Sequence, residues 1–428
     1  MTPTATPAPI RVAVTGANGG YGRTLLAQLR TVPAMDPTVL VDPDRDGVTA
    51  MLADLGIDGV TVVAGMDELP WSDVDVLVEA TGNVPAGIGY ATTAIEHGVH
   101  VVMVSKEVET VAGIALRRRA DARGVRYLPG DGDQPANLIR LTAWVERVGL
   151  EVVALGKSGE YDLQLDPATG TVTQLDETLD APALRDLLVL GDDVAATLAA
   201  RADAVSALRR RAAADSCEMT VVAQYTGAAA DREDLHYPVV RPSELADVYA
   251  ARADGGLIGT QRSVDVFSAL RLPGEASFAG GVFAVVRTGD PETWRTLAGK
   301  GHIVSRDGRY ACIAWPYHLM GVETPLTIAE AVSPTWTLPE PARHVVLGGR
   351  AAAPIAAGTT FRVHGHHHEI DGVDPVIRPG DEDAAPFYLL GGATLRHDVP
   401  AGHLLTLDDV DGVDARSAEL FHEGGVAA

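Results

Sequence analysis

Two lysines stand directly after predicted buried strands, which is where the polar site residues of α/β proteins gather. Lys106 follows an apolar run at residues 99–104, and Lys157 follows another at 150–155. A lysine at such a position can hydrogen-bond a carbonyl group or carry a proton, although Lys106 also fits a surface lysine that extends into solvent. Two strand-end lysines in an acidic chain indicate an anionic substrate, either a phosphate or a carboxylate.

Three further polar residues are candidates for chemistry. Asp133 and Gln134 lie in a turn at residues 129–135, after a predicted strand at 125–128. This turn is either a substrate or metal site, or the cap of a helix over 136–148. Glu218 lies in an increasingly apolar run and is either a buried site acid or a glutamate on a helix surface.

The start of the chain predicts a strand, a glycine turn and a helix that bind a dinucleotide. Residues 10–14 are typical of a buried strand, and residues 24–29 have helical periodicity. The glycine spacing between them suits a close backbone approach to a pyrophosphate at the helix N-terminus, and the alternative is a purely structural turn. The predicted cofactor contacts in this turn are Gly16, Asn18, Gly19, Gly20, Tyr21 and Gly22.

Asp42 strengthens the dinucleotide prediction. It ends the next apolar run, residues 38–41, near the offset of about 20 residues expected for the acid that binds the adenosine ribose. Its carboxylate would bind the ribose hydroxyls and repel a 2′-phosphate, so NAD is favoured over NADP. Arg45 lies close by in the sequence and is suited to receive that phosphate, so NADP stays open.

Strands and helices keep alternating after Asp42, which predicts a Rossmann-type, doubly wound parallel sheet over residues 1–150. Further strands are expected at residues 60–63, 74–78 and 99–104. Ligands of such sheets bind at the carboxyl ends of the strands. Thr81 and Gly82, which follow the second of these strands, are therefore additional cofactor candidates.

Residues 151–336 predict a second domain of the α+β type. Strand-like runs at 263–270, 281–286 and 310–315 follow an alanine-rich helical segment from 182 to about 225. The basic run Arg209-Arg210-Arg211 is expected on an exposed turn of that segment. His318 is either an acid–base group or a histidine packed in the core, and we favour the core.

A proline-rich linker at 337–341 leads to a third unit, residues 343–428, with short strands punctuated by glycine. Its clustered histidines invite a metal site: His364, His366, His367 and His368. Adjacent residues of a strand point to opposite faces, so we favour a polar turn or hairpin.

Composition limits the classes of function. The chain of 428 residues has a formal net charge of −24, which argues against a nucleic acid partner. Cys312 stands between Ala311 and Ile313, and the two cysteines, Cys217 and Cys312, are too few for a disulfide framework, so we expect buried thiols in a reducing compartment. Residues 1–9 lack an export signal and no run reaches about 18 apolar residues, so we expect a cytoplasmic protein without a membrane partner. We expect its substrate to be a small molecule.

A set of motifs in this chain resembles those of the homoserine-dehydrogenase-like proteins with a C-terminal SAF domain. This group contains the 1-deoxyxylulose-5-phosphate reductoisomerase-like (type II) enzymes. The motifs lie at residues 16–22, 79–82, 105–107, 132–135, 156–157, 218–219 and 309–319. Two short turns at 354–358 and 398–402 look like those of a SAF domain.

This resemblance implies a Rossmann domain, a central catalytic and oligomerisation domain and a small β-rich SAF-like tail. It also implies NAD(P)-dependent chemistry on a small polyhydroxylated, often phosphorylated, substrate. Lys106, Asp133, Gln134 and Lys157 match its motif positions and become site candidates. A homodimer or larger homo-oligomer is the default expectation.

Two positions depart from that family's pattern. Where the family carries lysines suited to a phosphate, this chain has residues 158–160, Ser-Gly-Glu, and residues 211–214, Arg-Ala-Ala-Ala. Each lost charged hydrogen bond would cost a phosphate substrate about 1.5 to 3 kcal/mol. We therefore expect the family's reaction to be kept with a changed substrate.

Three functions stay open at this point. The first is an NAD(P)-dependent oxidoreductase, with or without an isomerisation that would need a divalent cation on carboxylates such as Asp131, Asp133, Glu160 or Glu218. The second is a dehydrogenase of an unphosphorylated hydroxy acid or homoserine-like amino alcohol. The third is a non-enzymatic NAD(H)-binding sensor or scaffold. The polar groups at the strand ends favour an enzyme.

Overall fold

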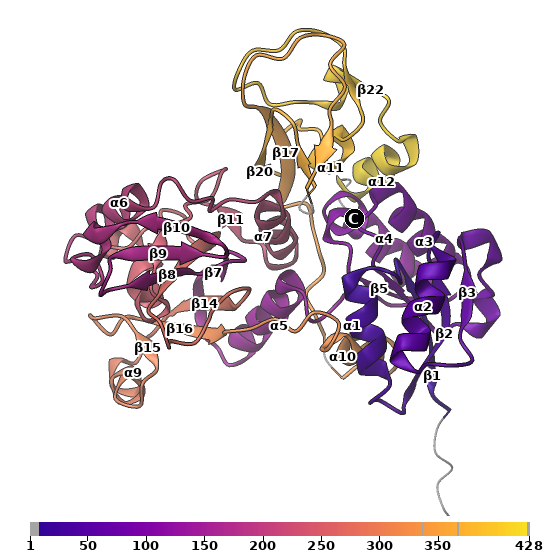
Figure 1. The fold of residues 1–428 in the computed structure, drawn as a ribbon, viewed down its shortest axis with the longest axis horizontal. Helices are drawn as coiled ribbons and strands as arrows, with labels where there is room; N and C mark the ends of the chain where they lie inside the picture. Colours follow the sequence, from indigo (N-terminus) through magenta and orange to yellow (C-terminus); the bar gives the residue numbers. More distant parts are fainter. Residues whose placement is uncertain (1–7, 336, 366–367, 426–428) are drawn as a thin grey trace, which may run out of the picture.

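A computed structural model describes residues 8–335, 337–365 and 368–425. Residues 1–7 lie outside the described residues. So do two members of the histidine cluster, His366 and His367. Three sheets of four or more strands, together with the helices between them, make up the fold (Figure 1). None of the helices in the described part of the chain has the length and hydropathy of a membrane span.

The first sheet has six parallel strands in the order β3-β2-β1-β4-β5-β6. Its central strands are runs of Val, Leu and Ala that are fully buried, because helices cover both faces. This strand order is that of the predicted doubly wound fold. The elements are β1 (Ile10–Thr15), α1 (Gly20–Leu29), β2 (Met35–Val41), α2 (Arg45–Leu55), β3 (Thr61–Val63), β4 (Val76–Glu79), α3 (Val84–Glu96), β5 (His100–Met103), α4 (Lys106–Arg123) and β6 (Tyr127–Pro129).

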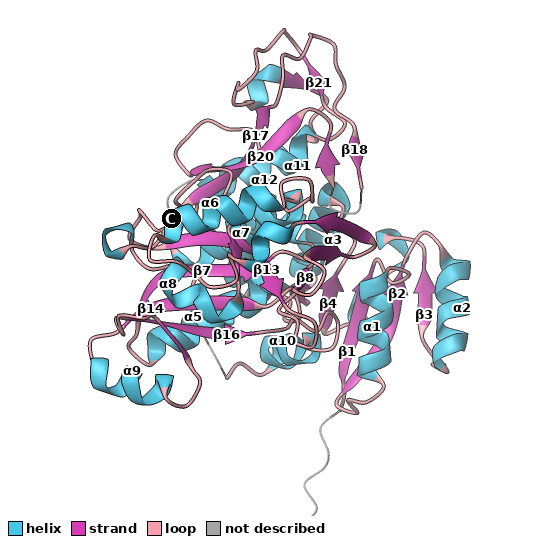
Figure 2. Cartoon of the chain, turned by 60° about the vertical axis from the view of Figure 1, so that its left-hand side comes forward, coloured by secondary structure: helices cyan, strands magenta, loops and turns pink. Residues whose placement is uncertain are grey.

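Helix α5 (Gln134–Arg147) leads from the parallel sheet to a larger mixed sheet, in which β7 and β13 run parallel at the centre and β14 is antiparallel to β7 (Figure 2). Its strands are β7 (Glu151–Ser158), β8 (Leu163–Asp166), β9 (Thr171–Gln174), β10 (Glu177–Asp180), β11 (Ala229–Ala230), β12 (Val239–Val240), β13 (Ser263–Arg271), β14 (Val282–Arg287), β15 (Ile303–Val304) and β16 (Tyr310–Trp315). Its helices are α6 (Val194–Ala204), α7 (Ala213–Thr226), α8 (Leu245–Val248) and α9 (Pro291–Ala298), and α10 (Thr324–Val332) returns to the parallel sheet.

The expectation of one helical segment from 182 to about 225 is wrong in part. A short 3-10 turn at Pro182–Arg185 is followed by α6, which starts separately because the Asp193 side chain accepts a hydrogen bond from Ala196 N at 2.9 Å. The extended backbone of Ala212, with φ −139° and ψ 148°, separates α6 from α7. The arginine run therefore lies in the loop 205–212 and not on a helix.

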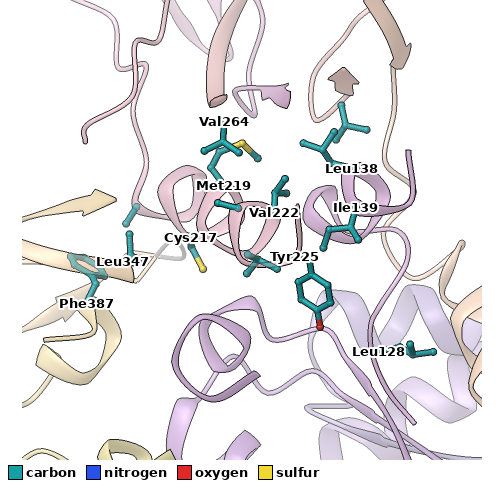
Figure 3. Close-up of a cluster of buried hydrophobic side chains, with 14 of the residues drawn as sticks. Leu128, Leu138, Ile139, Cys217, Met219, Val222, Tyr225, Val264, Leu347 and Phe387 are labelled. Carbon is teal, nitrogen blue, oxygen red and sulfur yellow. The ribbon is translucent and has the colours of Figure 1, made fainter. Parts of the chain in front are cut away.

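Helix α7 is the central packing element of the molecule. Its residues from Ala213 to Tyr225 are all buried, as expected for a helix that contacts neighbours on every side. Figure 3 shows Leu138 and Ile139 of α5 on one side of it and Leu347 and Phe387 on another. Because α7 also contacts α4 and β13, it holds Glu218 between the parallel and the mixed sheets.

The C-terminal unit contains an antiparallel sheet in the order β17-β20-β19-β18, above the other two sheets in Figure 1. The expected hairpin at His364 is confirmed, because His364 pairs with Glu369 across β18 and β19. Ile355 and Val399, from the two SAF-like turns, exchange backbone hydrogen bonds of 3.0 Å. The elements are β17 (Val345–Ala351), β18 (Val363–His364), β19 (Glu369–Ile370), β20 (Val373–Pro379), α11 (Phe387–Leu390), β21 (Thr394–Leu395), β22 (Val410–Asp411) and α12 (Ala415–Gly425), which packs on α4.

Candidate active site

The glycine turn after β1 has the shape that a pyrophosphate requires. Gly16 has φ +64°, and a Cβ on Gly16 or Gly22 would come within 2.4 Å of a backbone carbonyl oxygen. A Cβ on Gly20 would meet no described atom within 4 Å, and Asn18, Gly19 and Gly20 are exposed. Among the described residues no side chain caps α1, so its first N–H groups are available to an anion.

Tyr21 differs from its neighbours in this turn. Its hydroxyl group hydrogen-bonds Thr324 of α10. Burial raises the pKa of Tyr21, so the phenol stays neutral. Its side chain therefore connects the turn to α10, and only its backbone is positioned for a cofactor contact.

Asp42 is oriented by the glycine turn. Its carboxylate accepts a hydrogen bond from Asn18 N at 3.0 Å and another from Asp44 N at 2.9 Å. Asp44, which sequence reasoning missed, also accepts from the Asn18 side chain at 2.8 Å and caps α2. Arg45 pairs instead with Glu68 at 3.3 Å. Two carboxylates and a compensated arginine therefore surround the predicted ribose position.

Thr81 and Gly82 join the ends of β4 and β5. Glu79 is fully buried and accepts from Thr81 N at 3.0 Å and from the Thr81 hydroxyl at 2.6 Å. Burial raises the pKa of Glu79. Gly82 N donates to the Ser105 hydroxyl at 2.8 Å, which places the start of α4 beside these strand ends. Ser105, directly before Lys106, is a second residue that sequence reasoning missed.

All five predicted catalytic residues line one cavity of about 460 Å³. Lys106 comes from the first turn of α4, Asp133 and Gln134 come from the start of α5, Lys157 comes from β7, and Glu218 comes from α7. Asp133 is also the N-cap of α5 and accepts from Gln134 N at 3.0 Å. Asp133 therefore both caps α5 and lines the cavity, so the two interpretations of this aspartate are compatible.

Glu218 lies between the two lysines. Its Oε1 accepts from Lys106 Nζ and its Oε2 accepts from Lys157 Nζ. Burial opposes its charge, but the two ammonium groups outweigh burial and lower the pKa of Glu218 to about 2. Lys157 also binds Asp215 at 2.8 Å, and Asp215 accepts from the Tyr237 hydroxyl at 3.1 Å. The site acid predicted at Glu218 is thus held as an anion between two cations, of which Lys157 has Asp215 as a second partner.

The two lysines differ in their access to the cavity. The Lys106 side chain is 21% exposed and that of Lys157 only 2%. Burial opposes the Lys106 charge, but Asp133, Glu218 and Glu107 outweigh burial and raise its pKa well above the ordinary value. Burial raises the pKa of Asp133, whose Oδ2 lies 4.0 Å from Lys106 Nζ. Lys106 is therefore a fixed cation, and Asp133 is the neighbouring group suited to gain or lose a proton.

Within the described ranges, no three His, Cys, Asp or Glu side chains gather in a way that could hold a metal ion. Asp131 accepts from Arg140 Nε at 2.9 Å and from the Thr327 hydroxyl at 2.7 Å, and it is not part of the cavity wall. His364 pairs with Asp371 at 3.0 Å and His368 with Glu107 at 3.3 Å. Asp131, His364 and His368, which were considered for a cation, are thus held by other partners.

Sequence reasoning missed part of the cavity wall. His318 lies in this wall, half-buried, and not in the core that we favoured. Its Nδ1 is buried and has no hydrogen-bond partner in the described structure. The three arginines of the loop 205–212 also line the cavity. The sequence offered His318 as an acid–base group, after the β16 strand and within the motif at 309–319, but the core interpretation was favoured.

A family comparison covers the part of the chain that supplies most of the charged cavity. Residues 132–324 match the family model described as "Oxidoreductase DRL, catalytic domain". This part of the chain is an oxidoreductase catalytic domain, which confirms the prediction of an oxidoreductase. It includes four of the five predicted catalytic residues, whereas Lys106 precedes it. No curated protein sequence matches the chain significantly.

Solved structures show weaker similarity. An oxidoreductase from Agrobacterium radiobacter in complex with NAD+, L-tartaric acid and magnesium is 15% identical, with a TM-score of 0.30 over 38% of this chain and 47% of that chain. A myo-inositol dehydrogenase from Corynebacterium glutamicum is 20% identical, with a TM-score of 0.28 over 38% and 48%. GenD2 from gentamicin A biosynthesis, in complex with NAD, is 16% identical, with a TM-score of 0.36 over 78% and 89%. The matches to the first two span about half the length of those chains. These similarities are too weak to indicate a substrate for this chain.

Proposed function

We propose that the protein transfers hydride between NAD(P) and a small polyhydroxylated alcohol or carbonyl compound. The observation that carries this proposal is the position of Lys106. Its backbone begins α4 beside the contact between Gly82 and Ser105, at the predicted cofactor site. Its side chain lies in the cavity of the oxidoreductase catalytic domain. One residue therefore connects the two sites that a dehydrogenase must bring together.

The residues around the glycine turn fit a dinucleotide and favour NAD. The open space at Gly20 and the free N–H groups of α1 suit a pyrophosphate. Asp42 and Asp44 would repel the extra phosphate of NADP, and Arg45 is already paired with Glu68. NAD(P), when bound, supplies a nicotinamide ring that accepts or returns hydride.

The cavity residues divide the proton and charge chemistry between them. In the oxidation direction the substrate C–H bond breaks and both of its electrons leave with the hydride. The hydroxyl proton passes to the Asp133 carboxylate, and the C=O bond forms. Lys106 donates a hydrogen bond to the same oxygen and stabilises its developing negative charge. Glu218 and Lys157 hold the Lys106 ammonium group in position.

We also propose that the chain is a member of the reductoisomerase-like group, with a SAF-like C-terminal unit. The paired turns at Ile355 and Val399 support the SAF-like assignment, because both SAF-like motifs meet there. Whether an isomerisation accompanies hydride transfer is tested by comparing the products with 1-deoxyxylulose 5-phosphate, with and without magnesium or manganese. A skeletal rearrangement that needs the metal supports it, and simple reduction of the carbonyl contradicts it.

The hydride transfer proposal is tested with purified protein by following NADH and NADPH absorbance against polyols, their aldonic acids and their phosphate esters. We expect turnover with NAD(H) on at least one member of this panel. Tight NADH binding without turnover on any member would favour the non-enzymatic sensor instead.

A homodimer is proposed from the exposed apolar side chains on and near α5 and α10. Trp144 is 42% exposed, and Tyr317 and Met320, which precede α10, are also exposed. Light scattering is expected to give twice the monomer mass, and the monomer mass at all concentrations would contradict this.

A further inference from the structure

Loop 205–212 brings three consecutive arginines to the cavity wall, and their charges are not equally compensated. Arg209 pairs with Glu369 of β19, and Arg211 pairs with Asp234 at 2.9 Å. Arg210 donates to the backbone carbonyl of Tyr237 at 2.7 Å. Within the described residues Arg210 forms no ion pair, although the chain carries 58 acidic residues against 34 basic ones.

An uncompensated guanidinium in this position calls for an anion. Arg210 is half-buried, and burial together with the charge of Arg211 lowers its pKa. Arginine nevertheless keeps its proton in proteins, so the positive charge persists without an acidic partner. Its planar fork matches a carboxylate through two parallel hydrogen bonds.

The start of α7 lies in the same cavity wall as Arg210. Ala212 and Ala214, on either side of the first residue of this 14-residue helix, line the same cavity. The Asp215 carboxylate in the first turn accepts a hydrogen bond from Ala212 N at 3.2 Å and so already occupies part of this N-terminus. The helix dipole adds a positive potential beside Arg210, which the Asp215 carboxylate partly offsets.

A series of contacts joins Arg210 to Lys106, the residue proposed to act in the reaction. Arg210 contacts Tyr237, whose hydroxyl binds Asp215. Asp215 binds Lys157, which shares Glu218 with Lys106. Arg210 and Lys106 are therefore the two ends of one chain of contacts along the cavity. A substrate that reaches both ends reacts at Lys106 and Asp133 and carries its charged group to Arg210.

The number of free charges selects the kind of anion. Arg210 offers one uncompensated positive charge, whereas a phosphate ester carries up to two negative charges at neutral pH. Glu160, Asp176 and Glu177 line the same cavity and disfavour a second negative charge. A carboxylate carries a single charge and satisfies the guanidinium without an excess.

We propose that Arg210 binds the carboxylate of a polyhydroxylated acid, and that this acid is the substrate class of the enzyme. The reaction of this substrate rests on the proposed hydride transfer. The recognition of its carboxylate rests on Arg210 alone. Polyols matched in carbon number to their aldonic acids and phosphate esters, such as sorbitol, gluconate and sorbitol 6-phosphate, separate the three possibilities.

The kinetic test compares wild type with Arg210→Gln. We expect the acid to be preferred over both matched compounds in wild type, and KM for the acid to rise by about 30-fold in the variant, which corresponds to the loss of one charged hydrogen-bonded pair. The preference for the acid over sorbitol is lost in the variant, whereas the Kd for NADH stays unchanged because the cofactor turn lies in a different segment. Arg295→Gln, which removes an exposed arginine on α9, serves as the control and keeps the wild-type KM.

A measurement without turnover covers the case in which Arg210→Gln fails to fold. Phenylglyoxal modifies accessible guanidinium groups, and peptide mass mapping reports the rate at Arg210 in the wild-type protein. We expect gluconate to slow this modification more than sorbitol or inorganic phosphate does. Equal protection by phosphate, or none by gluconate, overturns the carboxylate site.

The two measurements separate failure of this site from failure of the proposed function. If gluconate protects Arg210 but no compound turns over, the site stands and the hydride transfer fails. If neutral polyols turn over and Arg210→Gln leaves the KM of the acid unchanged, the hydride transfer stands and the site fails.

Discussion

The predicted cofactor turn and the catalytic cavity are built in different ways. The turn uses backbone atoms within one continuous segment, from Gly16 to Asp42, and depends on where a side chain is absent. The cavity uses charged side chains from α4, α5, β7 and α7, which are far apart in the sequence. We expect the cofactor turn to keep its structure when residues around it change. We expect the charged network of the cavity to lose stability when one of its charges is removed. The predictions below test this difference.

The largest effect is expected at Glu218, because its removal leaves the buried ammonium groups of Lys106 and Lys157 without their shared carboxylate. We expect Glu218→Gln to lower the free energy of unfolding by about 3 to 5 kcal/mol. Urea denaturation measures this, with Glu292→Gln on the exposed surface of α9 as the control. A loss no larger than that of the control would contradict a network in which each charge depends on the others.

Lys106→Ala is expected to reduce kcat by about 10²- to 10³-fold, because it removes the cation that stabilises charge on the substrate oxygen. The Kd for NADH should change little, since the cofactor turn lies in a different segment. Lys300→Ala, which changes an exposed lysine, keeps wild-type rates. Full turnover by a folded Lys106→Ala variant would remove this lysine from the mechanism.

Two glycines of the turn give a matched pair with opposite outcomes. A Cβ at Gly22 meets the Ala17 carbonyl oxygen at 2.4 Å, so Gly22→Ala should cost about 1 to 3 kcal/mol of stability. Gly20→Ala places its methyl group in open space and should leave stability unchanged while it weakens NADH binding. Thermal unfolding and NADH titration measure the two effects. Equal stability losses would show that the turn is packed against protein at both positions.

The last prediction is a pH dependence of the stability that Glu218 provides. The pKa of Glu218 is lowered from 4.5 to about 2, so its ion pairs contribute their full stability above about pH 4.5 and lose it as the pH falls toward 2. The difference in unfolding free energy between wild type and Glu218→Gln should therefore shrink over this range. A difference that stays constant from pH 4.5 to about 2 would mean that the carboxylate is not held ionised by the lysines.

The contrast between the two regions also explains what the sequence could predict. The strand, the turn and Asp42 were predictable because their geometry is local, and the rule that strand ends gather polar groups identified Lys106 and Lys157. The placement of His318 and of the arginine loop in the cavity wall was not, because no local pattern reports which loop folds back onto a cavity; for His318 the sequence left the acid–base interpretation open but favoured the core. The contact between Tyr21 and Thr324 joins residues about 300 positions apart, and only the packing of α10 against the parallel sheet produces it. Local spacing therefore reveals where a site begins, and tertiary packing decides which side chains complete it.

The most direct test of the account is a single-turnover experiment with NADH that carries deuterium at the transferable position of the nicotinamide. The account predicts that wild-type protein moves the deuterium to a carbon of a polyhydroxylated carbonyl acceptor, and that Lys106→Ala binds the same NADH but transfers deuterium at least about 100-fold more slowly. Transfer at the same rate by Lys106→Ala, or binding of NADH by the wild type without transfer to any acceptor, would contradict it.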